Sequence, residues 1–394
     1  MNSVAQHRNR RIIYVQFTNP AAYPPLEHSA RLLAEKGWRV LGLAVVADTP
    51  VIMRFADHPN ITVKELPLPR RGWQRKLCYC AFVLWSLAWA VRWRAGWAYA
   101  SDPLACPAAW LLSWVPRLHV IYHEHDSPSF TDHAAAPTPG LMRIVLWTRR
   151  RLARRARLCV LPNEQRARQF LAETGPDVRV HCVWNCPTKE EVSDPRAAAN
   201  GRRIWILYHG SIVPARLPLA VIRALRLLPE RACLRVVGYE TTGHLGYSHR
   251  LRETAESLGV GGRLDLRSAV PRHDLFEVCR RCDIGLAFMP RNGTDLNERN
   301  MTGASNKAFD YLACGLPVLV SDLPDWRTMY VDAGVGLACD PDDPASIAAA
   351  LQWLLDHPDT MREMGERGRR RILEEWNYET QFAPVVDVLT SKKA

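Results

Sequence analysis

The stretch from Gly303 to Val320 carries residue types and a spacing suited to binding a phosphate group. Small and polar residues lead into Ser305, Asn306 and Lys307, where an apolar segment with helical spacing begins. Backbone N–H groups and the helix dipole attract anions at such a helix N-terminus. Lys307 adds a cation, and Asp310, one turn further on the same face, is placed to accept hydrogen bonds from ribose hydroxyls. The residues alone leave an ordinary well-capped helix as the alternative.

A second polar cluster, His123-Glu124-His125-Asp126, directly follows the apolar segment 119–122. Loops at the carboxyl ends of parallel strands are where such sheets present their functional groups. The His-x-His pattern with alternating acids could hold a metal, but no further ligand follows at a known metal-site spacing. We therefore expect no metal here, and a structural role for His125 is the simplest alternative to a functional one.

These clusters belong to a chain that alternates strand-like and helix-like segments. In the first half the expected strands are residues 11–17, 40–46, 61–66, 98–100, 119–122 and 158–161. In the second half they are residues 204–208, 234–237, 264–266, 284–288 and 317–320. Helix-like segments lie between the strands, and this βαβα order predicts parallel sheets with right-handed crossovers.

The alternation is interrupted once, at a stretch rich in proline and charge. We therefore predict an α/β protein with an N-terminal Rossmann-like domain over residues 1–187 and a linker over 188–202. A second Rossmann-like domain follows over 203–375, and the helical tail 376–394 could cross back to the first domain. The ligands of such sheets bind outside the carboxyl ends of the strands. Two facing sheets would then form a central cleft.

The second half resembles GT-B glycosyltransferases, particularly the retaining enzymes of glycosyltransferase family 4. The segment Ser305–Val320 matches the family pattern of a small-polar loop, a Lys, an acid and an Ala-x-Gly-x-Pro-Val segment. The segments Tyr208–Arg216, Val236–Gly238 and Cys282–Leu286 match the first strand and loop, the second-strand glycine and the strand before the signature loop. The resemblance covers nearly the whole chain and is strongest from 204 to 340.

The resemblance implies a function and a set of site residues. It implies transfer of a sugar from a nucleotide-diphosphate donor to a lipid-linked or saccharide acceptor, with retention and without a metal or cofactor. The donor-binding residues would be Gly210, Ser211, Arg216, Gly238, Ser305, Asn306, Lys307 and Asp310. His125 and Asp126 match a His-Asp pair that lies against the transferred sugar in related enzymes, which makes them the candidate catalytic residues.

The chain departs from the family pattern at several positions. The paired glutamates of the family fall at Thr302 and Asp310, and the usual arginine of the first donor loop is Ser211. Neutralisation of the diphosphate is thereby left to Arg216 and Lys307. In the N-terminal domain, the loop 18–25 lacks the usual pair of glycines.

The charge of the chain predicts a further partner. Residues 1–187 hold 25 of the 52 Lys and Arg but only 12 of the 40 Asp and Glu, so the net charge of +12 lies in the presumed acceptor domain. Six arginines crowd the segment 149–157, and Trp85, Trp89, Trp93 and Trp97 recur every four residues beside the apolar stretch 77–91. We expect docking on an anionic membrane surface. A buried core helix is the alternative for residues 77–97.

The composition restricts the remaining function classes. Eleven scattered cysteines favour a reducing cytoplasm over a disulfide framework, and the isolated Cys279–Cys282 pair is expected to be structural. We expect a cytoplasmic protein, peripheral at the inner membrane face. Two alternatives remain: a GT-B nucleotide-sugar epimerase, and a non-catalytic protein that binds nucleic acid or another anionic surface. No nucleic-acid recognition motif supports the latter, so nucleic acid is not expected as a partner.

Overall fold

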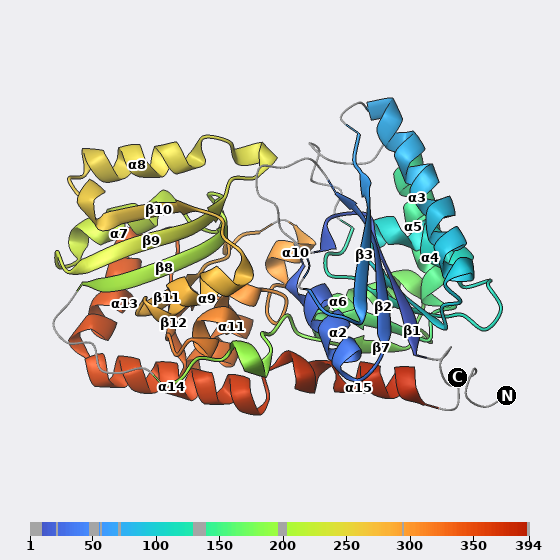
Figure 1. Ribbon diagram of the computed structural model, residues 1–394. Coiled ribbons are helices and arrows are strands. Elements are labelled where there is room, and N and C mark those ends of the chain that lie inside the picture. Colours follow the sequence, from blue (N-terminus) through green and yellow to red (C-terminus); the bar gives the residue numbers. More distant parts are fainter. Residues whose placement is uncertain are drawn as a thin grey trace. The chain divides into compact units, whose positions relative to one another are not determined.

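The computed structural model describes residues 10–20, 23–46, 55, 57–69, 72–128, 139–195, 203–293 and 295–391. The chain divides into two compact units (Figure 1). Unit 1 comprises residues 1–185 and 378–394, and unit 2 comprises residues 186–377. Part of the predicted linker, residues 196–202, lies outside the described residues. Its described part belongs to unit 2, where Glu191 accepts hydrogen bonds from Arg272.

Unit 1 is built on a parallel sheet whose strand order is β3-β2-β1-β4-β5-β6-β7 in the described residues. The strands are β1 Arg11–Gln16, β2 Arg39–Val46, β3 Ile61–Pro67, β4 Trp97–Ser101, β5 His119–His123, β6 Leu158–Leu161 and β7 Val180–Cys182. The helices are α2 Pro24–Glu35, α3 Gly72–Arg92, α4 Cys106–Leu112, α5 Pro139–Ala153, α6 Glu164–Thr174 and α15 Tyr378–Thr390. The sequence order reverses between β1 and β4, which is where ligands of doubly wound sheets bind.

Alternating side chains of these strands form two apolar layers. Ile13 and Val15 pack with α3, α4, α5 and α6, whereas Ile12 and Tyr14 pack with α2 and α15. The C-terminal helix α15 thus covers a face of the sheet in unit 1 beside α2 (Figure 1). Both faces of the sheet are covered, which explains the continuous apolar runs in the strand sequences.

Unit 2 repeats this architecture with the strand order β10-β9-β8-β11-β12-β13 in the described residues. The strands are β8 Ile204–Ser211, β9 Ala232–Tyr239, β10 Leu264–Ser268, β11 Ile284–Ala287, β12 Val318–Ser321 and β13 Gly336–Cys339. The helices are α7 Leu219–Leu227, α8 Tyr247–Ser257, α9 Arg272–Arg280, α10 Leu296–Arg299, α11 Asn306–Ala313, α12 Pro324–Trp326, α13 Pro344–Asp356 and α14 Pro358–Glu374. The reversal here lies between β8 and β11.

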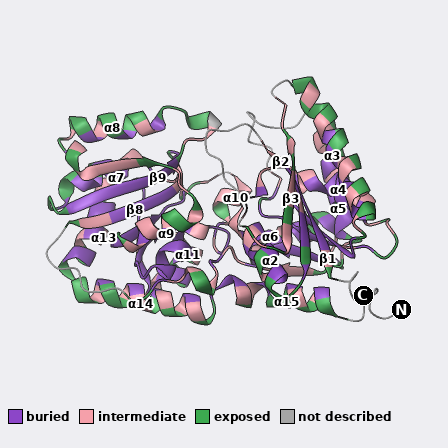
Figure 2. Ribbon diagram, viewed as in Figure 1, coloured by how far each residue is buried: buried purple, intermediate pink, exposed green. Residues whose placement is uncertain are grey.

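Helix α3 has features of both interpretations of the apolar segment 77–97, the buried core helix and the membrane-interface helix. Its inner side chains, such as Phe82, are buried in the core, while Trp73 and Leu84 are exposed (Figure 2). The four-residue spacing does not place Trp97 on the same helix as Trp85 and Trp89, because α3 ends at Arg92 and Trp97 is a buried residue of β4. No helix in the described part of the chain is both long and apolar enough to cross a bilayer.

Gly238 marks the closest approach between β8 and β9. It pairs in register with Gly210, and a Cβ on Gly238 would lie 1.9 Å from the Gly210 carbonyl oxygen. Gly238→Ala is therefore expected to destabilise unit 2 by about 3 kcal/mol, because the two strands cannot separate without losing their ladder. The midpoint of urea unfolding measures this effect. Gly262→Ala is the matched control, since nothing lies within 4 Å of its Cβ position, and an equal shift in both variants would contradict the prediction.

Candidate functional site

Most of the predicted donor-binding residues come together at the carboxyl end of the sheet in unit 2. Strand β8 ends in Gly210 and Ser211, and the Lys307 side chain lies directly over Gly210. Gly210 has a φ of +107°, and a Cβ there would lie 3.2 Å from Lys307 Nζ, so glycine is required on both counts. Arg216 Nη1 donates a hydrogen bond of 3.3 Å to Ser211 Oγ. The β8 loop and the start of α11 thus form one surface.

This surface carries two basic side chains that form no direct ion pair with a described carboxylate. Burial, together with the charge of Arg216, lowers the pKa of Lys307 to about 7 against the opposing effect of Asp310. Within the described residues, no carboxylate forms an ion pair within 4 Å of Lys307 or Arg216. Ser305, at the N-terminus of α11, is buried and its Oγ has no hydrogen-bond partner in the described part of the chain. Two cations, an unused hydroxyl and a helix N-terminus, which Asn306 begins, can bind a phosphate anion.

Asp310 has protein partners that the sequence did not predict. Its carboxylate accepts a 2.9 Å hydrogen bond from Arg272 Nη2, and His209 Nε2 lies 3.6 Å from its other oxygen. Burial and the charges of Lys307 and Arg272 lower the pKa of His209 well below its usual value, so this imidazole is neutral. Asp310 therefore joins α11 to α9, and its predicted contact with a ribose stays a prediction.

In unit 1, His125 lies just beyond the carboxyl end of β5. Its side chain is buried, with 4% of the residue exposed, and neither ring nitrogen has a hydrogen-bond partner in the described residues. Burial, followed by the charge of Arg166, lowers the pKa of His125 to about 3. A neutral imidazole with unsatisfied nitrogens at a strand end is suited to hydrogen-bond a substrate hydroxyl. Asp126 beside it is exposed.

Two residues that the sequence interpretation missed hold this loop in place. Asp102, at the end of β4 with a φ of +66°, accepts hydrogen bonds from the backbone N–H groups of His125 at 2.9 Å and Asp126 at 3.4 Å. Burial and the nearby Asp126 raise the pKa of Asp102 to about 7. From the other side, the buried Arg166 donates to the His125 carbonyl oxygen at 2.6 Å. An acid within two residues of the end of the predicted strand 98–100 is the signal that could have identified Asp102.

Comparison with known proteins decides the family. A glycosyl transferase 4-like domain model matches residues 25–186, and a glycosyl transferase-like model matches residues 219–387. The chain is a GT-B glycosyltransferase. The GDP-mannose-dependent alpha-(1-6)-phosphatidylinositol monomannoside mannosyltransferase of Mycolicibacterium smegmatis is 24% identical over 314 residues, covering 70% of this chain and 80% of the relative.

Solved structures share the fold of this glycosyltransferase. Sucrose-phosphate synthase from Thermosynechococcus elongatus aligns with a TM-score of 0.73 at 15% identity, over 96% of this chain and 98% of that chain. Anabaena HepE, in complex with UDP, aligns with a TM-score of 0.69 at 14% identity, over 96% and 99% of the two chains. These matches confirm the predicted fold class, and the two family models confirm the predicted enzyme class.

The structure corrects one part of the predicted basic surface of the glycosyltransferase. Arg149, the first of the six crowded arginines, is buried, and its Nε and Nη2 donate to the carboxylate of Glu124 at 2.5 and 2.8 Å. Tyr122 donates to the same carboxylate at 2.6 Å. Glu124 immediately precedes His125, so this buried network anchors the candidate catalytic loop. Arg149 is not available to a membrane.

Arg149→Met is expected to destabilise the glycosyltransferase by about 3–5 kcal/mol, because Glu124 would remain buried without its counter-charge. Arg150→Met is the matched control, since this neighbour is exposed and its removal leaves the core unchanged. The urea midpoints of the two variants should differ accordingly. Adding Glu124→Gln to Arg149→Met is expected to restore part of the loss. Equal midpoints for Arg149→Met and Arg150→Met would show that the buried pair is not stabilising.

The His-x-His segment is not part of a metal-binding cluster in the described residues. No group of three or more His, Cys, Asp or Glu side chains lies close enough there to hold an ion. His123 lies beside His125, with ring centroids 3.8 Å apart, but His123 Nδ1 is hydrogen-bonded to Tyr99 Oη at 2.6 Å. Cys279 and Cys282 are both buried, and neither forms a disulfide bond with a described cysteine.

Proposed function

We propose that this glycosyltransferase uses a nucleotide-diphosphate sugar as its donor and that unit 2 binds the diphosphate. The observation that carries the proposal is the pair of cations, Lys307 and Arg216, at the N-terminus of α11 without a carboxylate partner in the described residues. Two known proteins support this donor class. The mycobacterial relative is named for GDP-mannose, and the HepE structure contains UDP.

The chemistry of sugar transfer explains why such a site is useful. Negative charge develops on the departing diphosphate as the sugar becomes oxocarbenium-like. Preorganised donors aimed at that charge lower the barrier. Lys307, Arg216 and the free N–H groups of α11 would supply this stabilisation, so we propose transfer without a metal requirement. We also propose retention of the anomeric configuration, and NMR of the product distinguishes this outcome from inversion.

Unit 1 is the proposed acceptor-binding unit, with His125 contacting the transferred sugar. Its unsatisfied ring nitrogens can donate one hydrogen bond and accept another in the neutral form. The exposed carboxylate of Asp126 is the proposed partner of an acceptor hydroxyl. The acceptor class is a lipid-linked or saccharide glycoconjugate. The name of the mycobacterial relative includes phosphatidylinositol monomannoside, which is a glycosylated lipid. This name supports a lipid-linked acceptor.

We further propose that unit 1 docks on an anionic membrane, as a peripheral protein at the cytoplasmic face. The helices α3, α4 and α5 and the turn after α4, on one face of its sheet, carry large exposed apolar side chains among basic ones. These exposed apolar residues are Trp73, Leu77, Leu84, Val91, Trp114, Ile144 and Trp147. Tryptophan at headgroup depth and arginine near anionic lipid both favour such an interface.

A thermal-shift screen tests the donor proposal. UDP, GDP and their sugar conjugates are added to the purified full-length protein, and the matching nucleotide is expected to raise Tm because it binds the native state. Activity with the matching donor is then measured with and without EDTA, and a loss in EDTA would overturn metal independence. Incubation with donor alone separates transfer from epimerisation. An epimerised sugar formed without acceptor would overturn the proposed transfer.

A further inference from the structure

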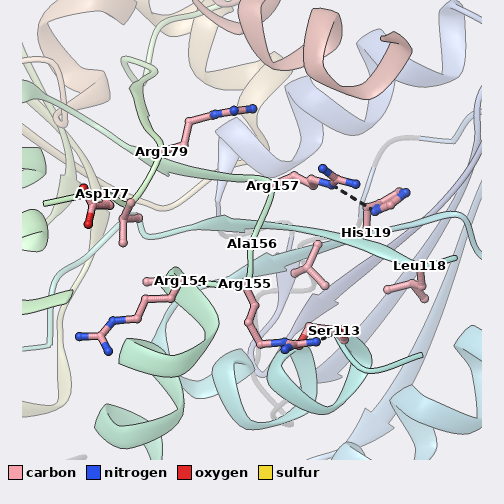
Figure 3. A pocket seen from close by; sticks show the side chains of 12 residues that line it. Ser113, Leu118, His119, Arg154, Arg155, Ala156, Arg157, Asp177 and Arg179 are labelled. Carbon is pink, nitrogen blue, oxygen red and sulfur yellow. Dashed lines mark hydrogen bonds between the residues drawn. The ribbon is translucent and has the colours of Figure 1, made fainter. Parts of the chain in front are cut away.

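A hollow of about 430 Å³ lies at the amino-terminal edge of the sheet in unit 1, where β5, β6 and β7 begin (Figure 3). The ends of α4 and α5 and the segment 177–179 complete its wall. His125 lies at the opposite end of β5, which spans five residues, so about 16 Å of strand separates it from this hollow. The hollow is therefore distinct from the candidate catalytic loop.

Four arginines line the hollow, namely Arg154, Arg155, Arg157 and Arg179, with Asp177 the one acidic residue in its lining. None of the four forms an ion pair within 4 Å with any described carboxylate, in contrast to the buried Arg149. Like charges gathered around a concave surface raise the local positive potential and attract anions. The planar guanidinium group, with several N–H donors, matches the oxygens of a phosphate.

Neighbouring residues orient two of these side chains. Arg157 Nε lies 3.3 Å from His119 Nδ1, and burial together with the charge of Arg157 lowers the pKa of His119, so the ring can accept this hydrogen bond. Arg155 donates to Ser113 Oγ at 3.0 Å and to the Ser113 carbonyl oxygen at 3.1 Å. The guanidinium groups of Arg155 and Arg157 extend to the same side of Ala156, whereas that of Arg154 extends to the other (Figure 3).

The rim of the hollow continues into exposed tryptophans. The Arg155 guanidinium lies 3.8 Å from the centre of the Trp114 ring, and Trp110 links this ring to Trp147 through centroid distances of 6.3 and 5.0 Å. Trp114 is 61% exposed and Trp147 is 47% exposed. A soluble anion would need no apolar neighbour. A lipid presents both a phosphate and an acyl boundary at which tryptophan is stable.

We propose that this arginine-lined hollow binds the phosphate of an anionic membrane lipid headgroup. The inference rests on the proposed membrane docking of unit 1, and it gives that docking a specific site. The binding would be independent of the donor site in unit 2.

The test measures binding of the full-length protein to vesicles of phosphatidylcholine, alone or mixed with phosphatidylglycerol. Arg157→Gln/Arg179→Gln is compared with Arg168→Gln/Arg252→Gln, which removes two exposed arginines outside the hollow. The first variant is expected to bind mixed vesicles about 30-fold more weakly than wild type, since each basic residue near the surface adds on the order of a fivefold attraction. The control is expected to lose less than about threefold.

Three outcomes would overturn the proposal. Equal losses in both variants would show diffuse charge attraction, and no loss in the first would show that the hollow is not used. If glycerol phosphate raised the Tm of the wild type but not of the first variant, and the two bound vesicles equally, the hollow would be assigned to a soluble anion. Nucleotide binding by thermal shift, measured on the same variants, is expected to be unchanged and separates this site from the donor proposal. If wild-type protein bound vesicles through the hollow but bound no nucleotide, only the donor proposal would be refuted.

Discussion

Lys307→Met is expected to lower kcat/KM by about 100- to 1000-fold, the cost of removing one donor that stabilises charge in a transition state. The Lys307 ammonium lies against Gly210 at the N-terminus of α11, where the diphosphate of the donor is proposed to bind. The affinity for the matching nucleotide diphosphate should fall as well. Steady-state kinetics and nucleotide titration measure the two effects. Arg252→Met, which removes an exposed cation from α8 of the same unit, is the control and should retain full activity.

The same variant is expected to be more stable than wild type, with a defined pH dependence. The pKa of Lys307 in the folded protein is about 7, below the usual lysine value of about 10.4. Between these values the unfolded chain holds a proton that the folded protein lacks, so the wild-type free energy of unfolding rises with pH in this window. The stability advantage of Lys307→Met should therefore be largest below pH 7 and shrink toward pH 10. A difference in urea midpoint that does not change with pH would contradict the buried charge.

His125→Ala is expected to lower kcat by about 100-fold, within the range that a positioned acid–base or hydrogen-bonding side chain contributes. Both ring nitrogens are buried and unpartnered in the described residues, so the substrate is their proposed partner. Because the pKa of His125 is lowered to about 3, the ring is neutral throughout the physiological range. The profile of kcat against pH should therefore show no inflection from this residue above about pH 4.

His181→Ala is the control for this prediction, since His181 is a half-buried histidine of β7 in the same unit. It should retain wild-type kcat and KM. A His125→Ala variant that keeps full activity while Tm falls would assign His125 a structural role. A loss of activity with an unchanged Tm supports direct contact with the substrate.

The local pattern of the sequence was sufficient for the fold and for the expectation that several candidate donor-binding residues lie close together. Alternation of apolar strands and amphipathic helices depends on residues close in the chain, and it predicts two parallel sheets with their loops at one edge. The first candidate donor loop follows β8, and Ser305 leads into α11. In a parallel sheet such segments lie at the same edge, so the order of the elements predicts that they are close together. Gly210, Ser211, Arg216 and Lys307 meet in the structure as this reasoning requires.

Partners far apart in the chain were decided only by the tertiary structure. Arg149 appeared in the sequence as one of six exposed arginines, yet it pairs with Glu124, 25 residues away, inside the core. Asp310 also accepts a hydrogen bond from Arg272 of α9, 38 residues away, which the sequence analysis did not predict. Such pairs depend on which strands are adjacent and which helix face turns inward, and charge patterning along the chain encodes neither. The sequence by itself determined where the loops with reactive and charged side chains lie. Tertiary packing determined which of those charges stay without a protein counter-charge, because a buried charge pairs with whichever opposite charge the fold brings near it.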